Sequence, residues 1–196
     1  SAQERLPNLA LDGAPGRALW RPHGVMAVIG PSNYPIHLMS THVAPALLAG
    51  NTVVLKPSRV TPLSGQIYAE IMHGLGLPDG VFNLVVGTRE IGGNLVAHPD
   101  VDAVAFTGSW DGGRRITAAC LDQPHKLLAL EMGGKNIAVV LDDGDLPQAL
   151  HEIVLGVCLT TGQRCTATSR LVVTRSAAER LLPRLQLPAH AQRNVR

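Results

Sequence analysis

Short apolar runs alternate with longer amphipathic segments along most of the chain. The first run, 25–29, ends at Gly30-Pro31, and the next, 52–55, ends at Lys56-Pro57. Runs of four to six apolar residues closed by Gly or Pro are typical of buried β-strands. The same pattern predicts further strands at 81–86, 101–106, 126–130, 137–141 and 170–174.

The segments between these runs have helical spacing and helical end signals, which predict helices at 37–48, 61–73, 92–97 and 110–119. Further along, Asp145 is the expected N-cap of a helix to about Thr160, and Ser176 is the expected cap of a last helix that Pro183 ends or kinks. Alternating strands and helices predict an α/β fold. Its sheet is expected to be mostly parallel and Rossmann-like, with helices on both faces.

Changes of pattern divide the chain into four parts. Residues 1–23 are rich in Pro and Gly and are predicted to be an irregular lead-in. The parallel sheet is expected over 24–130, and the beginning of a second α/β domain over 131–185. Residues 186–196 form a polar tail without pattern, so we expect no folded element there.

Composition excludes several classes of protein. Seventeen Lys and Arg against 15 Asp and Glu give a net charge of +2, with no basic block and few aromatic residues, so no nucleic-acid partner is expected. The apolar runs are far shorter than the roughly 18 residues of a membrane span, so no membrane partner is expected. Three cysteines without a CxxC pair argue against a disulfide framework and favour a reducing, cytoplasmic location. The scattered histidines predict no metal site.

A glycine-containing turn follows the strand that ends at Phe106 and opens the next helix. Its residues Gly108, Ser109 and Gly113 lie where free N–H groups and the helix dipole favour an anion. Gly108 allows close backbone approach, and Gly113 allows close packing of helix on strand. The spacing is GxxxxG rather than GxGxxG, so a tight turn without a ligand is the alternative.

Two more candidates lie just beyond strands. Lys56, followed by Ser58, is at the carboxyl end of a buried strand, where ligands of open α/β sheets bind. Its ammonium could donate to ribose or phosphate; the alternative is a solvated loop lysine. Asn33 could donate its amide to a developing oxyanion, or it could simply form a turn.

Cys165 and Glu131 are the candidates for covalent and acid–base chemistry. Cys165 lies in a polar loop beside Arg164, which favours the reactive thiolate. The alternative is an inert buried cysteine, as expected for Cys158 on an apolar helical run. Glu131 stands at a strand end, where it could act as a general base or pair with Lys135.

In order and spacing, these segments resemble the aldehyde dehydrogenase superfamily. The matching segments are GPSNYP (30–35), LLAGNTVVLKPS (47–58), GLPDGVFNLVVG (76–87), FTGS with its later glycine (106–113), LEMGGKN (130–136) and GQRCT (162–166). Within the superfamily, PALLAGN, GTREIGGNLVAHP and ALEMGGKN followed by GQRCT resemble the bacterial N-succinylglutamate 5-semialdehyde dehydrogenases of arginine catabolism. The resemblance implies an NAD(P)-binding domain over 24–130 and the start of a catalytic domain over 131–185.

The resemblance also implies an oxidoreductase that converts a small aldehyde, here succinylglutamate semialdehyde, to a carboxylic acid. Cys165 would attack the aldehyde, while the Asn33 amide and the Cys165 backbone N–H would hold the oxyanion. Glu131 would activate the water that hydrolyses the resulting thioester. Because relatives that pass the acyl group to coenzyme A would not need this base, a free acid is the expected product.

The same resemblance implies NAD as the cofactor. The residues expected to bind it are Pro31, Lys56, Ser58, Gly108, Ser109 and Gly113. Arg59 stands where many family members have an acidic residue that binds ribose hydroxyls. A cation there would tolerate a 2′-phosphate, so NADP is the alternative.

Family chains are well over twice as long as this one. The resemblance begins inside the cofactor-binding domain and is expected to end near Leu185, which predicts a partial chain with a truncated or frame-shifted end. The parent enzyme is expected to be a homo-oligomer. The alternative to an active enzyme is a truncated, catalytically inactive cofactor-binding fragment.

Overall fold

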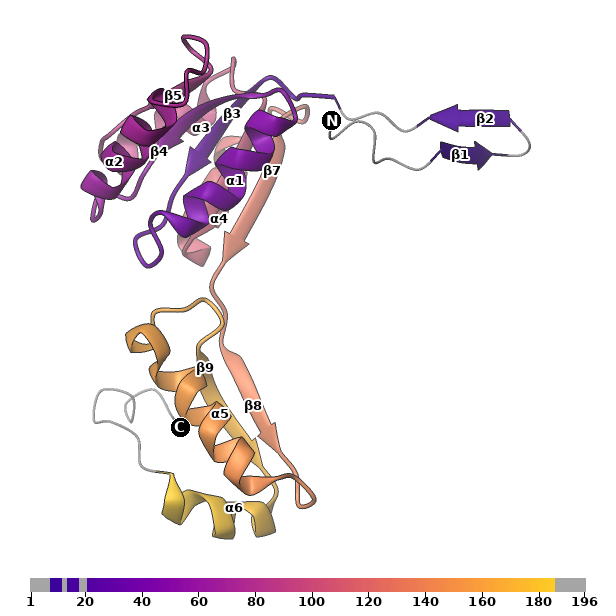
Figure 1. Ribbon diagram of the computed structural model, residues 1–196, viewed down its shortest axis with the longest axis vertical. Helices are drawn as coiled ribbons and strands as arrows, with labels where there is room; N and C mark the ends of the chain where they lie inside the picture. Colours follow the sequence, from indigo (N-terminus) through magenta and orange to yellow (C-terminus); the bar gives the residue numbers. More distant parts are fainter. Residues whose placement is uncertain (1–7, 12–13, 18–20, 186–196) are drawn as a thin grey trace. The chain divides into compact units, whose positions relative to one another are not determined.

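The computed structural model describes residues 8–11, 14–17 and 21–185 (Figure 1). Within the predicted irregular lead-in, β1 (Asn8–Leu11) and β2 (Ala14–Arg17) pair antiparallel. The prediction was therefore wrong for these two strands. The 186–196 tail lies outside the described residues.

The chain divides into two compact units between Met132 and Gly133, two residues beyond the domain boundary that the sequence suggests. The first unit contains a five-stranded parallel sheet in the order β5-β4-β3-β6-β7. Its strands are β3 (Val25–Ile29), β4 (Thr52–Lys56), β5 (Phe82–Leu84), β6 (Ala103–Gly108) and β7 (Leu127–Met132). Its helices are α1 (His37–Leu48), α2 (Pro62–His73), α3 (Arg89–Ala97) and α4 (Trp110–Ala119).

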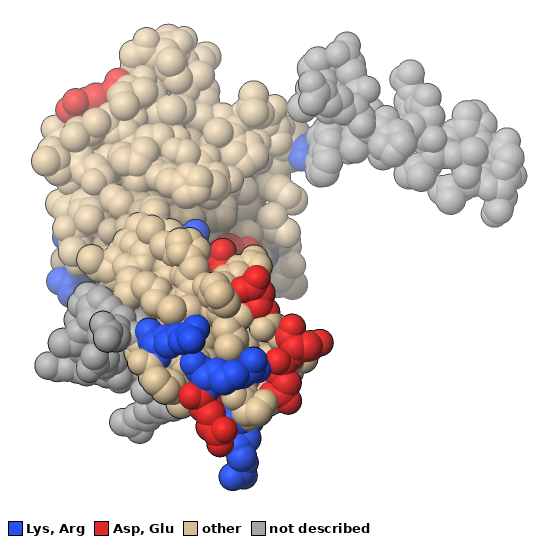
Figure 2. Space-filling view, turned by 60° about the horizontal axis from the view of Figure 1, so that its bottom comes forward, with Lys and Arg blue, Asp and Glu red and all other residues tan. Residues whose placement is uncertain are grey.

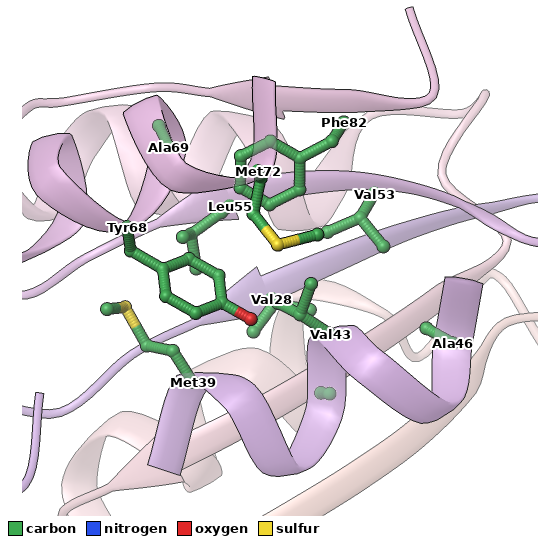
Figure 3. Close-up of a cluster of buried hydrophobic side chains, with 11 residues drawn as sticks. Val28, Met39, Val43, Ala46, Val53, Leu55, Tyr68, Ala69, Met72 and Phe82 are labelled. Atoms are coloured by element: carbon green, nitrogen blue, oxygen red, sulfur yellow. The ribbon is translucent and has the colours of Figure 1, made fainter. Parts of the chain in front are cut away.

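Helices cover both faces of this sheet, as predicted (Figure 1). On one face, α1 and α2 pack on β3 and β4, and Figure 3 shows the side chains that meet there. That cluster comprises Val28, Met39, Val43, Ala46, Val53, Leu55, Tyr68, Ala69, Met72, Phe82 and Ala105. On the other face, α3 and α4 pack through Val96, Ile116 and Cys120. The two clusters hold the sheet rigidly, so its edge can position side chains.

The second unit is a smaller α/β element. Two parallel strands, β8 (Asn136–Val140) and β9 (Thr168–Val173), are joined by α5 (Leu146–Cys158) and the 3₁₀ turn η2 (Leu159–Gly162). After β9 come α6 (Arg175–Leu181) and η3 (Leu182–Arg184). Both helices pack against the strands in one cluster that includes Val140, Ile153, Val157, Ala177 and Leu181.

The two predicted helix caps of this unit have different outcomes. The Asp145 side chain accepts a hydrogen bond from the backbone N of Gln148 and caps α5, as predicted. The prediction for Ser176 was wrong, because α6 begins at Arg175 and its N-cap is Thr174, two residues earlier. The Ser176 hydroxyl donates instead to the carboxylate of Asp142, which also accepts from Thr174.

Candidate active site

The carboxyl edge of the five-stranded sheet brings several of the predicted residues together. In β3, Ile29 is opposite Lys56 of β4 and Phe106 of β6. One residue further, Gly30 donates its N–H to the Lys56 carbonyl over 2.9 Å, and Thr107 is opposite Glu131. The turn that carries Pro31 and Asn33 therefore begins in the same row as Glu131.

The side chains at this edge point to opposite faces of the sheet. Successive residues of a strand alternate between faces. Because Leu55 packs under α1 and α2, Lys56 points to the face of α3 and α4. Thr107 follows Phe106, which packs on the α3 and α4 face, so Thr107 and its neighbour Glu131 point to the face of α1.

Lys56 is buried, and the alternative of a solvated lysine was wrong. Only 6% of the residue is exposed, and its Nζ donates to the carbonyl of Pro57 over 3.2 Å. A Cβ on Gly92 of α3 would lie 3.2 Å from the Lys56 side chain, so this glycine lets the helix cover the lysine stem. Burial lowers the pKa of the Lys56 ammonium. The ammonium has three protons, so donors remain for a ligand.

Pro31, Ser58 and Asn33 flank this position. Pro31 is buried and Asn33 is half-buried. The Ser58 hydroxyl accepts from the backbone N of Val60 over 3.2 Å, which fixes the turn after β4.

The glycine turn before α4 is tightly packed. The Ser109 hydroxyl accepts from the backbone N of Gly112 over 3.1 Å and caps the helix. A Cβ on Gly113 would lie 2.3 Å from the sulfur of Met132, so Gly113 allows the close packing of α4 on β7 that was predicted. At Gly108 the absent Cβ makes room for the Phe106 ring, whose Cζ would lie at 2.5 Å.

Sequence reasoning missed His42, which faces Glu131 from α1. Its Nε2 lies 3.0 Å from the Thr107 hydroxyl, and Thr107 is the direct neighbour of Glu131. Burial lowers the pKa of His42, and the charge of Glu131 partly opposes this shift. No sequence pattern marks His42 as a candidate, because only the fold places this position of α1 against β6.

Cys165 lies in the second unit, on an exposed turn after η2. The N–H of Ala167 donates to the Arg164 carbonyl over 3.1 Å, so Cys165 and Thr166 are the two central residues of the turn. The alternative of a buried cysteine was therefore wrong for Cys165, and its reactivity stays a prediction. Cys158, by comparison, is half-buried against the cluster of α5 and α6.

The candidate residues thus belong to two units. Asn33, Lys56 and Glu131 lie along one sheet edge in the first unit, and Cys165 lies in the second. Their convergence on one cleft, like the pairing of Glu131 with Lys135, stays a prediction.

The charged surface is mixed in sign. On the face shown in Figure 2, lysine and arginine side chains lie beside aspartate and glutamate side chains. On α4, Asp111 pairs with Arg115 over 2.9 Å and with Arg114 over 3.9 Å. Within the described ranges, His, Cys, Asp and Glu side chains form no group of three that could hold a metal ion. No helix in the described part of the chain is both long and apolar enough to cross a bilayer.

Comparison with known sequences places these features in a family. The model of the aldehyde dehydrogenase family matches residues 2–193, which extends beyond the expected 24–185 at both ends. The chain is 50% identical over 164 residues to N-succinylglutamate 5-semialdehyde dehydrogenase 1 of Caulobacter vibrioides, covering 84% of this chain and 35% of that protein. It is 49% identical over 158 residues to the enzyme of the same name from Erwinia tasmaniensis, covering 81% of this chain and 32% of that one. The chain therefore spans about a third of the length of these relatives.

Solved structures agree in fold. Lactaldehyde dehydrogenase from Escherichia coli superposes with a TM-score of 0.81 at 40% identity, covering 84% of this chain and 35% of that one. PnpE in complex with nicotinamide adenine dinucleotide superposes with a TM-score of 0.83 at 37% identity, covering 92% of this chain and 37% of that one. The family match, the relatives and the parallel sheet lead to one conclusion: the chain belongs to the aldehyde dehydrogenase family.

Proposed function

We propose that this chain carries the cofactor-binding sheet and the nucleophile of an NAD(P)-dependent aldehyde dehydrogenase that oxidises succinylglutamate semialdehyde to succinylglutamate. One observation supports this most. One edge of a parallel sheet carries Lys56, the turn of Asn33, and Glu131. The chain is also about 50% identical, over the aligned residues, to enzymes named for that substrate. The parent enzyme is proposed to be a cytoplasmic homo-oligomer.

The chemistry assigned to the residues is a covalent oxidation. The Cys165 thiolate forms a C–S bond to the aldehyde carbon, and the carbonyl oxygen becomes an oxyanion held by the Asn33 amide and the Cys165 N–H. NAD, when bound, would supply the acceptor for the hydride that this carbon loses, and a thioester would then remain on Cys165. Glu131 takes a proton from water, the water oxygen bonds to the thioester carbon, and the C–S bond breaks to give the acid and the thiolate.

The residues around Lys56 fit the cofactor. A buried ammonium with unused protons at the carboxyl end of β4 suits a ribose hydroxyl, and Ser58 stands beside it. Exposed Arg59 suits a 2′-phosphate, so a comparison of NAD with NADP as co-substrates is part of the test. An Arg59→Glu variant is expected to favour NAD over NADP by repelling the extra phosphate.

Production of NADH from succinylglutamate semialdehyde by the purified chain tests the proposal. Cys165→Ala is expected to abolish turnover, whereas Cys158→Ala, which removes a cysteine outside the proposed chemistry, is expected to retain it. Glu131→Gln is expected to give one burst of NADH without steady turnover, because the thioester forms but is not hydrolysed. Normal turnover of the Cys165→Ala variant would show that the nucleophile is assigned wrongly.

An inactive cofactor-binding fragment is the second candidate, and the length of the chain favours it. The chain spans about a third of its curated relatives, so much of a substrate pocket would lie outside it. A thermal shift with NAD but no aldehyde-dependent NADH would support this candidate. Turnover by the chain alone would exclude it.

A further inference from the structure

Asn136, the first residue of β8, is hydrogen-bonded through its side chain to the turn that carries Cys165. Its side-chain Nδ2 donates to the carbonyl of Cys165 over 2.8 Å and to the carbonyl of Ala167 over 3.3 Å. One amide group thus binds the peptide carbonyls on both sides of Thr166. The segment GGKN contributed to the resemblance, but sequence reasoning gave Asn136 no role of its own.

The strand pairing is irregular at the same place. Asn136 is opposite Thr168, but Ile137 is opposite Arg170, so Ser169 is an extra residue in β9. The Ser169 hydroxyl donates to the carbonyl of Asn136 over 3.3 Å. Bulges of this kind redirect the chain at the end of a strand and are common beside active sites. Here the bulge directs the preceding residues, 164–167, toward the Asn136 amide.

Two neighbouring contacts fix both ends of this arrangement. The Arg170 guanidinium donates to the carbonyl of Lys135 over 3.1 Å, next to Asn136. On the other side, a Cβ on Gly156 would lie 2.5 Å from the Thr168 hydroxyl, so α5 packs closely on the start of β9. Asn136 is therefore a side-chain donor between a fixed strand and an exposed turn.

The turn leaves the backbone N–H of Cys165 available. The turn's own hydrogen bond runs from Ala167 to Arg164 and uses neither central N–H. If Cys165 is the nucleophile proposed above, this N–H is the donor for the oxyanion. This N–H shares its peptide plane with the Arg164 carbonyl, which accepts the turn's own hydrogen bond. Asn136 binds the next carbonyl along the chain, that of Cys165, and the carbonyl of Ala167, and so holds the turn that orients this plane.

We propose that Asn136 is a positioning residue for the reaction: it holds the Cys165 turn so that the sulfur and the backbone N–H of Cys165 act on the same carbonyl group. This inference rests on the proposed function for its chemistry. It goes beyond that function by assigning a role to a residue that the proposed chemistry does not use.

Two reagents separate positioning from simple thiol reactivity. Iodoacetamide alkylates the sulfur by displacing iodide, and no oxyanion forms. p-Nitrophenyl acetate acylates the sulfur through a tetrahedral oxyanion, which then expels p-nitrophenolate and leaves an acetyl thioester. The ratio of the two rates at Cys165, read by mass spectrometry of its peptide, therefore reports whether an N–H donor faces the oxyanion.

The test uses the full 196-residue chain and three variants. Asn136→Ala removes both hydrogen bonds, and Asn136→Asp keeps the shape but offers no N–H donor. Asn83→Ala is the matched control, since it removes an amide-to-carbonyl bond of the same kind, 2.7 Å to Gly80, in the first unit. Both Asn136 variants are expected to lower the rate of acylation about tenfold or more while alkylation changes by less than about threefold. Asn83→Ala should change neither rate.

Hydrogen exchange at the amide of Ala167, whose N–H donates to the Arg164 carbonyl, provides an independent measurement. Loss of the Asn136 amide is expected to increase exchange there about tenfold, while the amides of β8 and β9 keep their protection and show that the unit is folded. An unchanged ratio of acylation to alkylation, or equal loss of both rates, would overturn the inference while the proposed nucleophile stands. Absence of acylation at Cys165 in the unsubstituted chain would overturn the proposed function as well.

Discussion

The two units use the same kind of strand pairing but bury it differently. In the first unit the central strands are covered on both faces, and Val53 and Val104, which point to opposite faces, are both 0% exposed. In the second unit α5 and α6 cover one face of β8 and β9. Residues on the other face stay exposed: Ile137 is 51%, Val139 63% and Val172 51% accessible.

The difference in strand burial suggests that the two units differ in stability. Parallel strands are normally buried on both faces. An apolar face this open is typical of a surface that further protein covers, and the relatives are about three times as long as this chain. In the first unit, Lys56 lies on a strand that is buried on both faces, although Glu131 lies on β7, which has one exposed face. In the second unit, Cys165 lies on an exposed turn before a strand with one bare face. We therefore expect the second unit to open more readily than the first.

The largest expected effect comes from truncating a core residue of the first unit. Leu55→Ala removes a fully buried side chain and should lower the free energy of unfolding of that unit by about 2–5 kcal/mol. Val139→Ala truncates an apolar side chain on the open face of the second unit. It should lower the free energy of unfolding of that unit by less than about 1 kcal/mol.

Because two units need not unfold together, hydrogen exchange in increasing urea, read peptide by peptide, is the appropriate measurement. An equal cost for Leu55→Ala and Val139→Ala would show that the face of Val139 is covered, and the comparison between the units would fail.

A smaller effect, confined to the second unit, is expected at the cap of α5. Asp145→Ala removes the acceptor for the Gln148 N–H and should lower the stability of that unit by about 1 kcal/mol. Asp145→Asn keeps an acceptor and should be nearly neutral. The same peptide-resolved exchange measurement applies, with the strands of the first unit as the internal reference. Loss of protection in β3 or β6 would mean that the two units unfold as one.

Much of the secondary structure could be predicted from the sequence alone. The helices 37–48 and 110–119 were predicted with the boundaries that they have, because local signals mark them: Gly50 follows the end of the first, and Ser109 precedes the start of the second. The predicted strand 81–86 is three residues long, since β5 lies at the edge of the sheet and pairs only with β4.

The site depended more on distant contacts. The burial of Lys56 comes from Gly92, far along the chain, and no local pattern signals it. The contact of His42 with Thr107 likewise needs α1 to lie on β6. The role proposed for Asn136 depends on a bulge between two strands that 27 residues separate, from Val140 to Thr168. Local sequence thus predicted which residues stand at strand ends, but not which side chains meet there.

The smallest expected effect concerns the charge at the edge of the first unit. Burial holds the pKa of His42 below its ordinary value, and the negative charge of Glu131 raises it part of the way back. Glu131→Gln removes that charge, so the pKa of His42 should fall further, as followed by NMR titration of the imidazole. Glu70→Gln on α2 is the control, since it makes the same change of charge on an exposed helix position that bonds Gln66.

The direction of the His42 pKa shift also determines how the stability of the first unit depends on pH. Because the folded state binds a proton at His42 less readily than the unfolded chain does, His42 favours the fold above its ordinary pKa. This contribution is lost as the pH falls from that value through the folded pKa. Glu131→Gln should therefore steepen the loss of stability of the first unit in mild acid, whereas His42→Gln should flatten it. A pKa of His42 that rises, or that stays the same, in the Glu131→Gln variant would show that the two side chains do not share this edge of the sheet.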